Sequence, residues 1–578
     1  MAMEKFFGDY DWKFLCMPPN PFKRTAREQP PFFGHDDPIA PFVAMIMGLQ
    51  HALAMVGGVI TVPLLVAGGF DANLGPEQTQ YLISAALITS GITSIIQVMQ
   101  IKIPKTNIVI GTGLVSVMGT SFTFLPVARD AISQARDPNH TGKRWLERSK
   151  DQWMKTKTDF LDDDGEFDGV KAYGAILGTF LVCSWVEIIL AFVKPKALRK
   201  VFPPIVTGVT VFLIGAALVG TGFKYWGGGA FCGDNYMNDI PCSGNGDVVL
   251  PFGSAVYVGL GFSVFAMLVV LEVFGSPFMR SINVVVALLF GYFVAAVSSD
   301  KGNDYVVSTK IDAAESITFL WVFTYPLTVY PPLILPSILA FIVTTVETIG
   351  DVTTTAEVSK LPVEGPEHFQ RIRGGLLGDG ISSFLSSLFT SMPNTTFSQN
   401  NGVIALTRCA SRRAGIACAC WLIVFGILAK IAAFFTSIPD CVLGGMTTFL
   451  FANVAVSGIK ILASTGDSRR SRFIVACSMG LGLGVTIAPA WATNNLWPCS
   501  DCGEALLSFR DGVILVLSTG YSMGCAAAII LNLIIPNEAM ETETPLPTKA
   551  IEEEKEKETE AAPVAATAPA AVVDAPAV

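Results

Sequence analysis

Long apolar runs separated by short polar connections fill the chain from about residue 40 to residue 535. A helix needs about 20 apolar residues to cross a bilayer, so each run predicts one membrane span. The runs 107–126 and 396–408 are the least regular, because both are rich in Gly, Ser, Thr and Asn and the second is too short to cross alone. The pattern predicts an all-α polytopic membrane protein with fourteen spans, near 40–67, 80–101, 107–126, 170–193, 201–222, 250–275, 281–299, 328–350, 371–390, 396–408, 411–436, 440–463, 472–490 and 511–535.

The composition agrees with a membrane protein. Of 578 residues, 51% are hydrophobic and only 15% are charged, whereas soluble proteins carry about 25% charged residues. The formal net charge is −9, and the sequence contains no stripe of basic residues. A nucleic-acid binder is therefore excluded. A disordered chain and a disulfide-rich secreted module are excluded by the same apolar content.

The two ends of the chain differ from the apolar middle. Residues 1–39 are mixed and charged, with no short apolar core ending in a cleavage site, so we expect a cytoplasmic segment and no cleaved signal peptide. Residues 536–578 are acidic and then rich in Ala and Pro. This composition predicts a disordered cytoplasmic tail.

Positive charges in the short loops orient the spans. With the amino terminus inside, the loops predicted to be cytoplasmic hold most of the Lys and Arg near span ends. The 127–169 connection is the exception, because it is predicted outside and yet carries several Lys and Arg beside at least as many acids. The basic residues that support this orientation are Lys102, Lys105, Lys194, Lys196, Arg199, Lys200, Arg280, Arg371, Arg373, Arg408, Arg412, Arg413, Arg469, Arg470 and Arg472.

Two cysteine pairs and one sequon fall on the predicted outer side. Cys232/Cys242 and Cys499/Cys502 lie in loops between spans and are disulfide candidates. Asn139 begins an Asn-His-Thr sequon and is a glycosylation candidate. A zinc site is the alternative for the second cysteine pair, but no His lies nearby, so no metal site is expected.

Two stretches of the chain resemble each other. "FPPIVTGVTVFLIG" from Phe202 and "IPDCVLGGMTTFLF" from Ile438 align without gaps, so that Gly208 matches Gly444. The first begins the fifth span and the second the twelfth. Because the offset is seven spans, an odd number, the two halves enter the membrane in opposite directions. The inverted repeats of secondary transporters have this arrangement.

The same offset pairs the two irregular spans, the third and the tenth. Each has a polar or β-branched stretch, a Gly and a short apolar segment, which suggests extended backbone leading into a half-helix. Such backbone is tolerated at membrane depth only where protein or a cavity satisfies it. Two half-helix amino termini meeting there would bind a polar or anionic small molecule.

Ionisable side chains inside spans cost about 2.5–3.5 kcal/mol each on insertion scales, so each needs a reason. Glu347 and Asp351 share one helix face at i and i+4, and two like charges there disfavour joint ionisation. His51 lies in the first span and Asp379 in the ninth. A proton-coupled carrier needs such groups, and a structural hydrogen bond to a neighbouring helix is the alternative for each. Glu187, Glu272 and Lys430 lie near span ends or stand alone, and there we expect a structural role.

Amide and aromatic side chains accompany the irregular spans. Gln399, Asn400 and Asn401 stand just ahead of the tenth half-helix. Amides offer donors and acceptors, which suits a heterocycle whose edge alternates N–H and C=O. A helix cap is the alternative, but a cap needs only one amide. Phe122 could stack on a ring or fill the core.

These motifs together resemble one known family. "QNNGVIALTR" at Gln399 to Arg408 matches the signature of the nucleobase–ascorbate transporter family, and "GLQHALAM", "ETIGDVT" and "GDGISS" are similar to further motifs of that family in the right order. The resemblance covers roughly residues 40–535, and within the family it is closest to the fungal uric acid–xanthine permeases. A leading Gln resembles the purine carriers, whereas uracil carriers tend to have Glu there and ascorbate carriers Pro.

The resemblance implies a domain plan and a mechanism. Spans one to four (40–193) and eight to eleven (328–436) would form a core domain, and spans five to seven (201–299) and twelve to fourteen (440–535) a gate domain. It also implies proton symport of xanthine and uric acid across the plasma membrane, an elevator-like movement and a homodimer. Both termini would be cytoplasmic, and no cofactor other than the coupling proton and no nucleic acid partner is implied.

The resemblance also implies roles for single residues. Glu347 and Gln399 resemble the purine-binding pair. Phe122 resembles the stacking ring, and Ser121 beside it is a further substrate-binding candidate. The supporting or proton-linked groups of the family are resembled by His51, Asp351 and Asp379. The groups that shape specificity and the half-helix are resembled by Asn400, Gly402, Thr407 and Arg408. Thr519 and Tyr521 fall where fungal members place a selectivity filter. Those members have Phe at the second position, which leaves the breadth of purine specificity open.

Other classes of function fit the residues less well. A channel needs a continuous polar lining, whereas the polar groups cluster in four spans. A membrane-embedded hydrolase needs a nucleophile or metal motif, and none is recognisable, so we expect no enzyme. A carrier of inorganic anions, or of another nucleobase such as uracil, on the same architecture is the remaining alternative.

Overall fold

The computed structural model describes most of the apolar part of the chain. The described residues are 10–18, 31–68, 71–106, 108–136, 167–193, 197, 200–234, 241–300, 303–306, 309–312, 314–466, 468–492 and 503–536. Asn139, Cys499 and Cys502, on which sequence-based predictions fall, lie outside them, as does nearly all of the tail. The described residues up to Leu533 belong to one compact unit.

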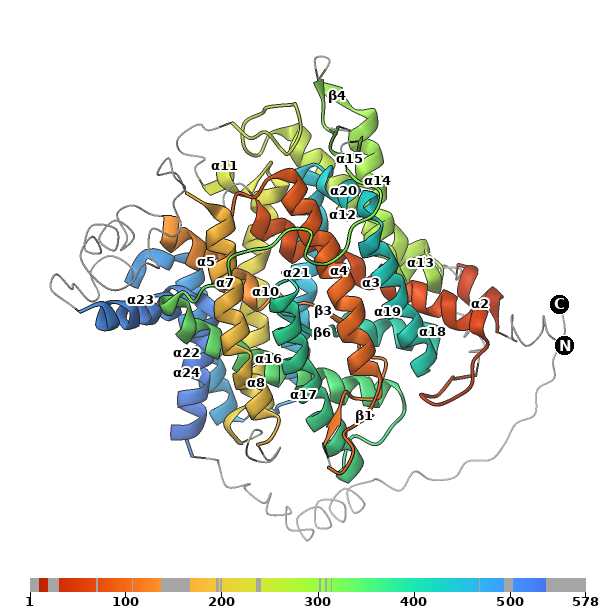
Figure 1. Cartoon of the computed structure of the whole chain (residues 1–578), viewed down its shortest axis with the longest axis vertical. Coiled ribbons are helices and arrows are strands. Elements are labelled where there is room, and N and C mark those ends of the chain that lie inside the picture. The colour runs from red at the N-terminus through yellow and green to blue at the C-terminus, as the bar shows by residue number, and fades with distance from the viewer. Residues whose placement is uncertain are drawn as a thin grey trace, which may run out of the picture. The chain divides into compact units, whose positions relative to one another are not determined.

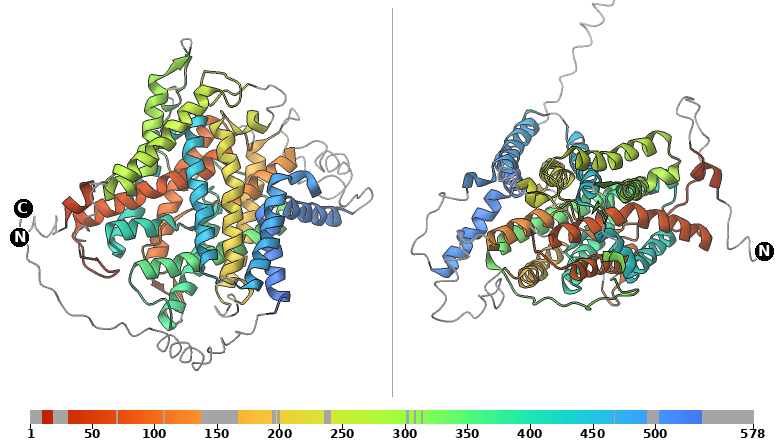
Figure 2. Two further views of the ribbon diagram at one scale, coloured as in Figure 1. Left: turned by 180° about the vertical axis from the view of Figure 1, so that it is seen from behind. Right: turned by 90° about the horizontal axis from the view of Figure 1, so that it is seen from above.

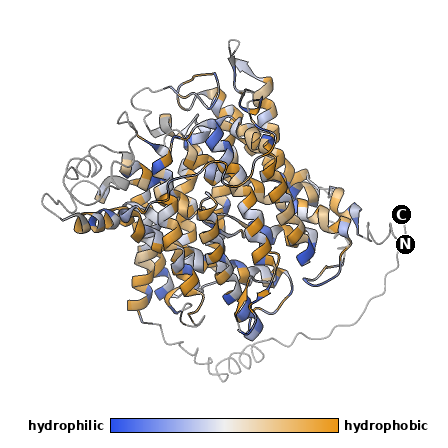
Figure 3. Ribbon diagram, in the orientation of Figure 1, coloured by the Kyte–Doolittle hydropathy of each residue, from blue (hydrophilic) through white to orange (hydrophobic). Residues whose placement is uncertain are grey.

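The described part of the chain is mostly helical (Figure 1). Seven of its helices are long and apolar enough to cross a membrane, and two bent helix pairs raise that number to nine. In Figure 3 the hydrophobic colour extends along these helices. The seven are α3 (Pro41–Ala67), α4 (Pro76–Val98), the joined α7 (Gly169–Cys183) and α8 (Trp185–Leu190), α10 (Pro204–Trp226), α12 (Ala255–Phe274), α16 (Pro331–Val358) and α21 (Asp440–Ala463).

The remaining runs form bent or shorter elements. Helix α19 (Arg412–Ile427) meets α20 (Ala429–Thr436) at 74°, and α23 (Glu504–Ser518) meets α24 (Gly520–Ile534) at 91°. Seven to nine spans are therefore recognisable as apolar helices, against fourteen apolar runs in the sequence. The other elements are α2 (Trp12–Cys16), β1 (Ile101–Lys102), β2 (Val109–Ile110), β3 (Met118–Thr120), α5 (Phe124–Arg136), α11 (Ala230–Asp234), α13 (Pro277–Ser281), α14 (Asn283–Val297), β4 (Ser299–Asp300), β5 (Asn303–Asp304), α15 (Thr309–Asp312), α17 (Pro366–Leu388), β6 (Asn394–Thr396), α18 (Gln399–Thr407), α22 (Arg469–Ile487) and the 3₁₀ turn η2 (Pro489–Ala492).

Proline begins many of the long helices. The first residue of α3, α4, α10, α16 and α17 is a proline in each case. Proline suits this position because its fixed φ is already helical and its missing N–H is one that the first turn leaves unpaired. The helix starts can therefore be located from the sequence once the apolar runs are known.

Helices α10 and α21, which carry the two similar sequence stretches, pack side by side in antiparallel directions (Figure 2, left). Gly208 lies against Leu462, and Gly444 lies against Trp226. A Cβ atom on Gly444 would come within 2.0 Å of the Trp226 backbone nitrogen, so only glycine allows this approach.

These contacts are reciprocal. The offset that aligns Gly208 with Gly444 also aligns Trp226 with Leu462, so each glycine near the start of its own helix meets the equivalent position near the end of the other. Gly222 against Thr448 and Gly458 against Phe212 form a second such pair of contacts. The two helices are thus related by an approximate two-fold axis at the level of individual residues.

The two irregular runs meet through their backbones. Strand β3 lies in the first and β6 in the second, and they pair antiparallel with Gly119 opposite Thr395. All residues of both strands are buried, and Figure 1 labels both in the middle of the helices. Helix α5 begins soon after β3 and α18 soon after β6. The pairing supplies the strands with backbone hydrogen bonds where water is absent.

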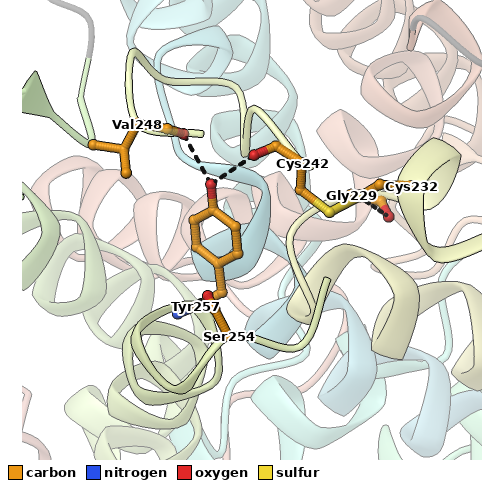
Figure 4. Close-up of a disulfide and its surroundings, with 6 residues drawn as sticks. All are labelled: Gly229, Cys232, Cys242, Val248, Ser254 and Tyr257. Atoms are coloured by element: carbon orange, nitrogen blue, oxygen red, sulfur yellow. Dashed lines mark hydrogen bonds between the residues drawn. A yellow bond between two sulfur atoms is a disulfide. The ribbon is translucent and has the colours of Figure 1, made fainter. Parts of the chain in front are cut away.

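A disulfide closes the loop between α10 and α12. Cys232 and Cys242 are bonded, with their Cα atoms 5.5 Å apart (Figure 4). The hydroxyl of Tyr257 on α12 lies 2.9 Å from the carbonyl oxygens of both Cys242 and Val248. The loop is therefore held both covalently and by the first turn of the following helix.

Candidate functional site

Side chains from three neighbouring helices fix the paired strands. The Thr120 hydroxyl donates to the Val59 carbonyl of α3 (2.8 Å), and the Ser94 hydroxyl of α4 accepts from the Met118 N–H (2.8 Å). On β6, the Asn394 carbonyl accepts from Ser383 of α17 (2.8 Å). The strands are thus held rigidly, as a binding site requires.

Aromatic rings lie beside the strands. Phe122, which follows β3, stacks on Phe397, which follows β6, with ring centroids 6.1 Å apart and planes inclined by 12°. Phe451 of α21 meets Phe122 edge-on at 5.4 Å. The ring of Phe397 rests on Gly58 and Gly119, where a Cβ atom would come within 2.7 and 2.5 Å of it. Two glycines therefore make room for this aromatic pair.

Two carboxylates of α16 face the strands. Glu347 accepts a hydrogen bond from the Thr123 hydroxyl (3.4 Å), and Asp351 accepts one from the Thr396 hydroxyl (2.9 Å). Both acids are half-buried. Their positions at i and i+4 thus direct one of them to the segment after β3 and the other to β6.

A third carboxylate comes from α17. Asp379 is fully buried and accepts hydrogen bonds from the hydroxyls of Thr348 and Thr395, the latter at 3.4 Å. None of the ion pairs found in the described part of the chain involves Asp379, Glu347 or Asp351. Hydroxyl groups rather than cations therefore contact these acids.

The amides at the start of α18 have different partners. Asn400 contacts His51 Nδ1 through its side-chain oxygen and donates to the Val115 carbonyl through its side-chain nitrogen. Asn401 accepts from the Thr355 hydroxyl (2.7 Å). Neither acts as the helix cap, because the N-cap is Ser398. Gln399 is half-buried, and its side chain forms no hydrogen bond within the described residues.

The far end of α18 lies away from this cluster. Gly402 is exposed, and the Thr407 hydroxyl donates to the Val403 carbonyl of the same helix. Arg408 ends the helix with a left-handed φ of 55° and lies over the ring of Phe32. These signature residues therefore shape α18 rather than join the acids.

An N-terminal tyrosine secures that end of α18. The Tyr10 hydroxyl donates to the Thr407 carbonyl at 3.0 Å. Burial raises the pKa of Tyr10 well above its ordinary value, so the hydroxyl keeps its proton and remains a donor at neutral pH.

Two residues at the break between α23 and α24 reach the segment after β3. The Thr519 hydroxyl donates to Asp130 of α5 at 2.8 Å, and the Tyr521 hydroxyl donates to the Thr123 carbonyl at 2.9 Å. Ser121 joins the same segment, because its N–H donates to the Pro393 carbonyl and its hydroxyl accepts from the Thr123 N–H.

Threonine hydroxyls are the polar groups that sequence reasoning missed. Thr348, Thr395 and Thr396 each donate to a carboxylate of the cluster. The signal available in the sequence was the high content of threonine in "TTVETIGDVTTT" and "NTT". Which threonine meets which acid depends on the packing of α16, α17 and β6. Within the described residues, no group of three or more His, Cys, Asp or Glu is arranged to hold a metal ion.

Comparison with known proteins identifies relatives along most of the chain. The model of the permease family Xan_ur_permease matches residues 42–491. A "Purine permease" of Emericella nidulans is 44% identical over 92% of this chain and 88% of its own length. A "Uric acid-xanthine permease" of the same organism is also 44% identical, over 95% of this chain and 91% of its own. The "Xanthine permease XanP" of Escherichia coli is 33% identical over 85% of this chain and 91% of its own.

Solved structures share the fold at low sequence identity. The transmembrane domain of the cyanobacterial bicarbonate transporter BicA matches with a TM-score of 0.50 and 12% identity, covering 77% of this chain and 95% of that one. The transporter SLC26A9 matches with a TM-score of 0.50 and 12% identity, covering 84% of this chain and 64% of that one. These likenesses describe the fold and carry no information about the substrate.

Proposed function

Because the chain belongs to the permease family Xan_ur_permease, a family of multi-pass membrane transporters and not of enzymes, we propose that it carries xanthine and uric acid across the plasma membrane together with protons. The names of its relatives support a purine as substrate. The buried Asp379 and the half-buried Glu347 and Asp351 around the paired strands support a role for protons.

The observation that carries the proposal is the difference in exposure among the polar groups. Asp379 and His51 are fully buried, whereas Glu347 and Gln399 are only half-buried. In the proposal, Glu347 and Gln399 therefore bind the N–H and C=O edge of the purine, and Phe122 offers its ring. Asp379 and His51 support the site or hold the coupling proton, and so does the half-buried Asp351, whose carboxylate accepts from Thr396. No cofactor takes part in the proposed mechanism.

The proposed mechanism is an elevator-like movement of a core domain against a gate domain. Fourteen spans would form two inverted repeats of seven, with the broken third and tenth spans in the core. The reciprocal glycine contacts between α10 and α21 support such a repeat, because an inverted repeat relates the two helices by a two-fold axis. The termini would be cytoplasmic.

The outer surface supports lipid contact and a homodimer in the proposal. Large apolar side chains on α12 and α14 are exposed, among them Phe262, Phe274 and Phe293. Apolar surface of this kind needs lipid or a second subunit to cover it.

Transport of labelled xanthine into cells that lack their own purine carriers tests the proposal. Uptake at two pH values, in competition with a panel of purines and pyrimidines, is the measurement. We expect saturable uptake that is faster at acid pH and is competed by uric acid and not by uracil or bicarbonate. Competition by uracil, or uptake of an inorganic anion instead, would select one of the alternative substrates.

A further inference from the structure

A fourth carboxylate lies beside the three already described. Glu187 belongs to the short helix α8, which continues α7 after a break at Ser184. Its side chain is fully buried, and its carboxyl group faces Asp379 of α17 and Thr344 of α16. Glu187 therefore does not stand alone near a span end, as its position in the sequence suggested.

A close helix contact brings these two acids together. A Cβ atom on Gly380, the residue after Asp379, would come within 2.9 Å of the Ile188 nitrogen, the residue after Glu187. The glycine thus allows the backbones of α17 and α8 to approach at the positions next to the two carboxylates.

Three of the four carboxylate oxygens of Glu187 and Asp379 lack a hydrogen-bond donor among the described residues. Asp379 receives its hydroxyl donors on Oδ2, and its Oδ1 is buried without a partner. Both carboxylate oxygens of Glu187 are likewise buried without a donor among the described residues, and the Thr344 hydroxyl donates to the Phe341 carbonyl at 3.1 Å. Buried acceptors without donors are costly, and two facing carboxylates also repel each other.

The surrounding titratable groups do not relieve this cost. Glu187 faces Asp379 and Glu347, and Asp379 is also approached by Glu347 and Asp351. All of these are acids, and the described ion pairs include no Lys, Arg or His paired to them. A single proton would remove the repulsion and convert the facing acceptors into an O–H···O hydrogen bond.

We propose that Glu187 and Asp379 form a carboxyl pair that shares one proton, with Glu187 as the positioning residue that keeps the coupling proton on Asp379. The proton binds to one carboxylate of the pair, is hydrogen-bonded by the other and leaves from the same pair, so no other reactant is required. This inference rests on the proposed proton-coupled transport and assigns its proton to a defined pair of residues.

The first test is the pH profile of xanthine uptake by the Glu187→Gln variant. Without the like-charged neighbour, Asp379 holds its proton less tightly, so the pH of half-maximal uptake should fall by about one pH unit. Glu272→Gln, on the exposed side of α12, is the matched control and should leave the profile unchanged. A merely structural Glu187 would change the amount of transporter or its maximal rate without moving the profile.

A second test detects the protonated carboxyl group directly. Infrared spectra of the purified wild-type protein should contain a carboxylic-acid band that disappears as the pH is raised, and that band should be absent or shifted in Glu187→Gln. If no carboxylic-acid band titrates in the wild type, the shared proton is excluded, whether or not the variant folds.

The outcomes separate the two proposals. Wild-type uptake that depends on pH, with an unchanged profile and an unchanged band in Glu187→Gln, overturns the carboxyl pair alone. Wild-type protein that does not carry xanthine overturns the proposed function, and the infrared titration then still decides whether the pair shares a proton.

Discussion

Tyr521 donates a hydrogen bond to the Thr123 carbonyl across 2.9 Å, although the two residues are separated by 398 positions in the chain. Thr123 also donates to Glu347 through its hydroxyl. The break between α23 and α24 is therefore connected to a carboxylate of the candidate site through one residue.

Replacing Tyr521 by Phe tests this connection. The change removes the hydroxyl and its hydrogen bond to the Thr123 carbonyl, at a cost of about 1 kcal/mol. The segment after β3 should be held less firmly, so purines other than xanthine and uric acid should compete better for uptake. The measurement is the inhibition constant of each purine, with Tyr305→Phe as a control on another buried tyrosine. An identical inhibition pattern would separate Tyr521 from specificity.

Glu347→Ala and Gln399→Ala test the proposed purine-binding pair. Each change removes a polar group that remains partly exposed. Xanthine uptake should fall at least about 100-fold while the protein still reaches the cell surface, because a site built to bind polar edges loses a partner for the substrate. Glu357→Gln, an exposed acid on the same helix α16, is the matched control. Near-normal uptake by both variants would refute this assignment.

Asn400→Ala should destabilise the protein. Asn400 connects His51 to the Val115 carbonyl inside the structure, and its loss leaves both without their partner. We expect a loss of about 2 kcal/mol, seen as a lower midpoint of thermal unfolding in detergent. Asn453→Ala is the control, because its amide only donates to Phe449 of its own helix. Equal midpoints for the two variants would argue against the bridge.

Gly444→Ala should disrupt the contact between α10 and α21. The added Cβ atom would lie 2.0 Å from the Trp226 nitrogen, and this backbone atom cannot turn away as a side chain could. We expect a cost of several kcal/mol and little folded protein at the cell surface. Gly220→Ala on α10 meets no atom within 4 Å and is the control. Surface fluorescence of tagged variants compares the two.

Reduction of the Cys232–Cys242 disulfide should destabilise the loop that it closes. The two cysteines are separated by 10 positions, and loops of this length contribute about 3 kcal/mol in the chain-entropy model. The midpoint of thermal unfolding should fall in Cys232→Ser and no longer respond to reductant. Cys420→Ser, which changes an exposed free cysteine, should behave as the wild type.

The sequence predicts some features of this fold well, because they depend on local patterns. The apolar runs and the prolines at helix starts locate the starts of α3, α4, α10 and α16 to within a few residues, whereas α16 continues to Val358, beyond its run 328–350. The membrane class and the family are confirmed. The bend between α23 and α24 was not predicted. The stretch "STGYS" at 518–522 interrupts the apolar run 511–535, but the contacts that Thr519 and Tyr521 make with distant segments depend on packing.

The candidate site was predictable in its ionisable residues and not in their partners. Glu347 and Asp351 are conspicuous because charge is rare within an apolar span. Glu187 was expected to have a structural role, and its proximity to Asp379 was not predicted, because Asp379 comes from a helix almost 200 positions later in the chain. Such contacts depend on helix packing, which apolar periodicity does not encode.

The antiparallel pairing of β3 and β6 has a mechanical consequence. Because Gly119 is registered opposite Thr395, neither strand can slide past the other without breaking the hydrogen bonds that pair them. In the proposed transport mechanism, a flat molecule bound beside the paired strands would therefore keep the same neighbours from binding to release. Discrimination between cargoes would then be completed at entry, before any displacement begins.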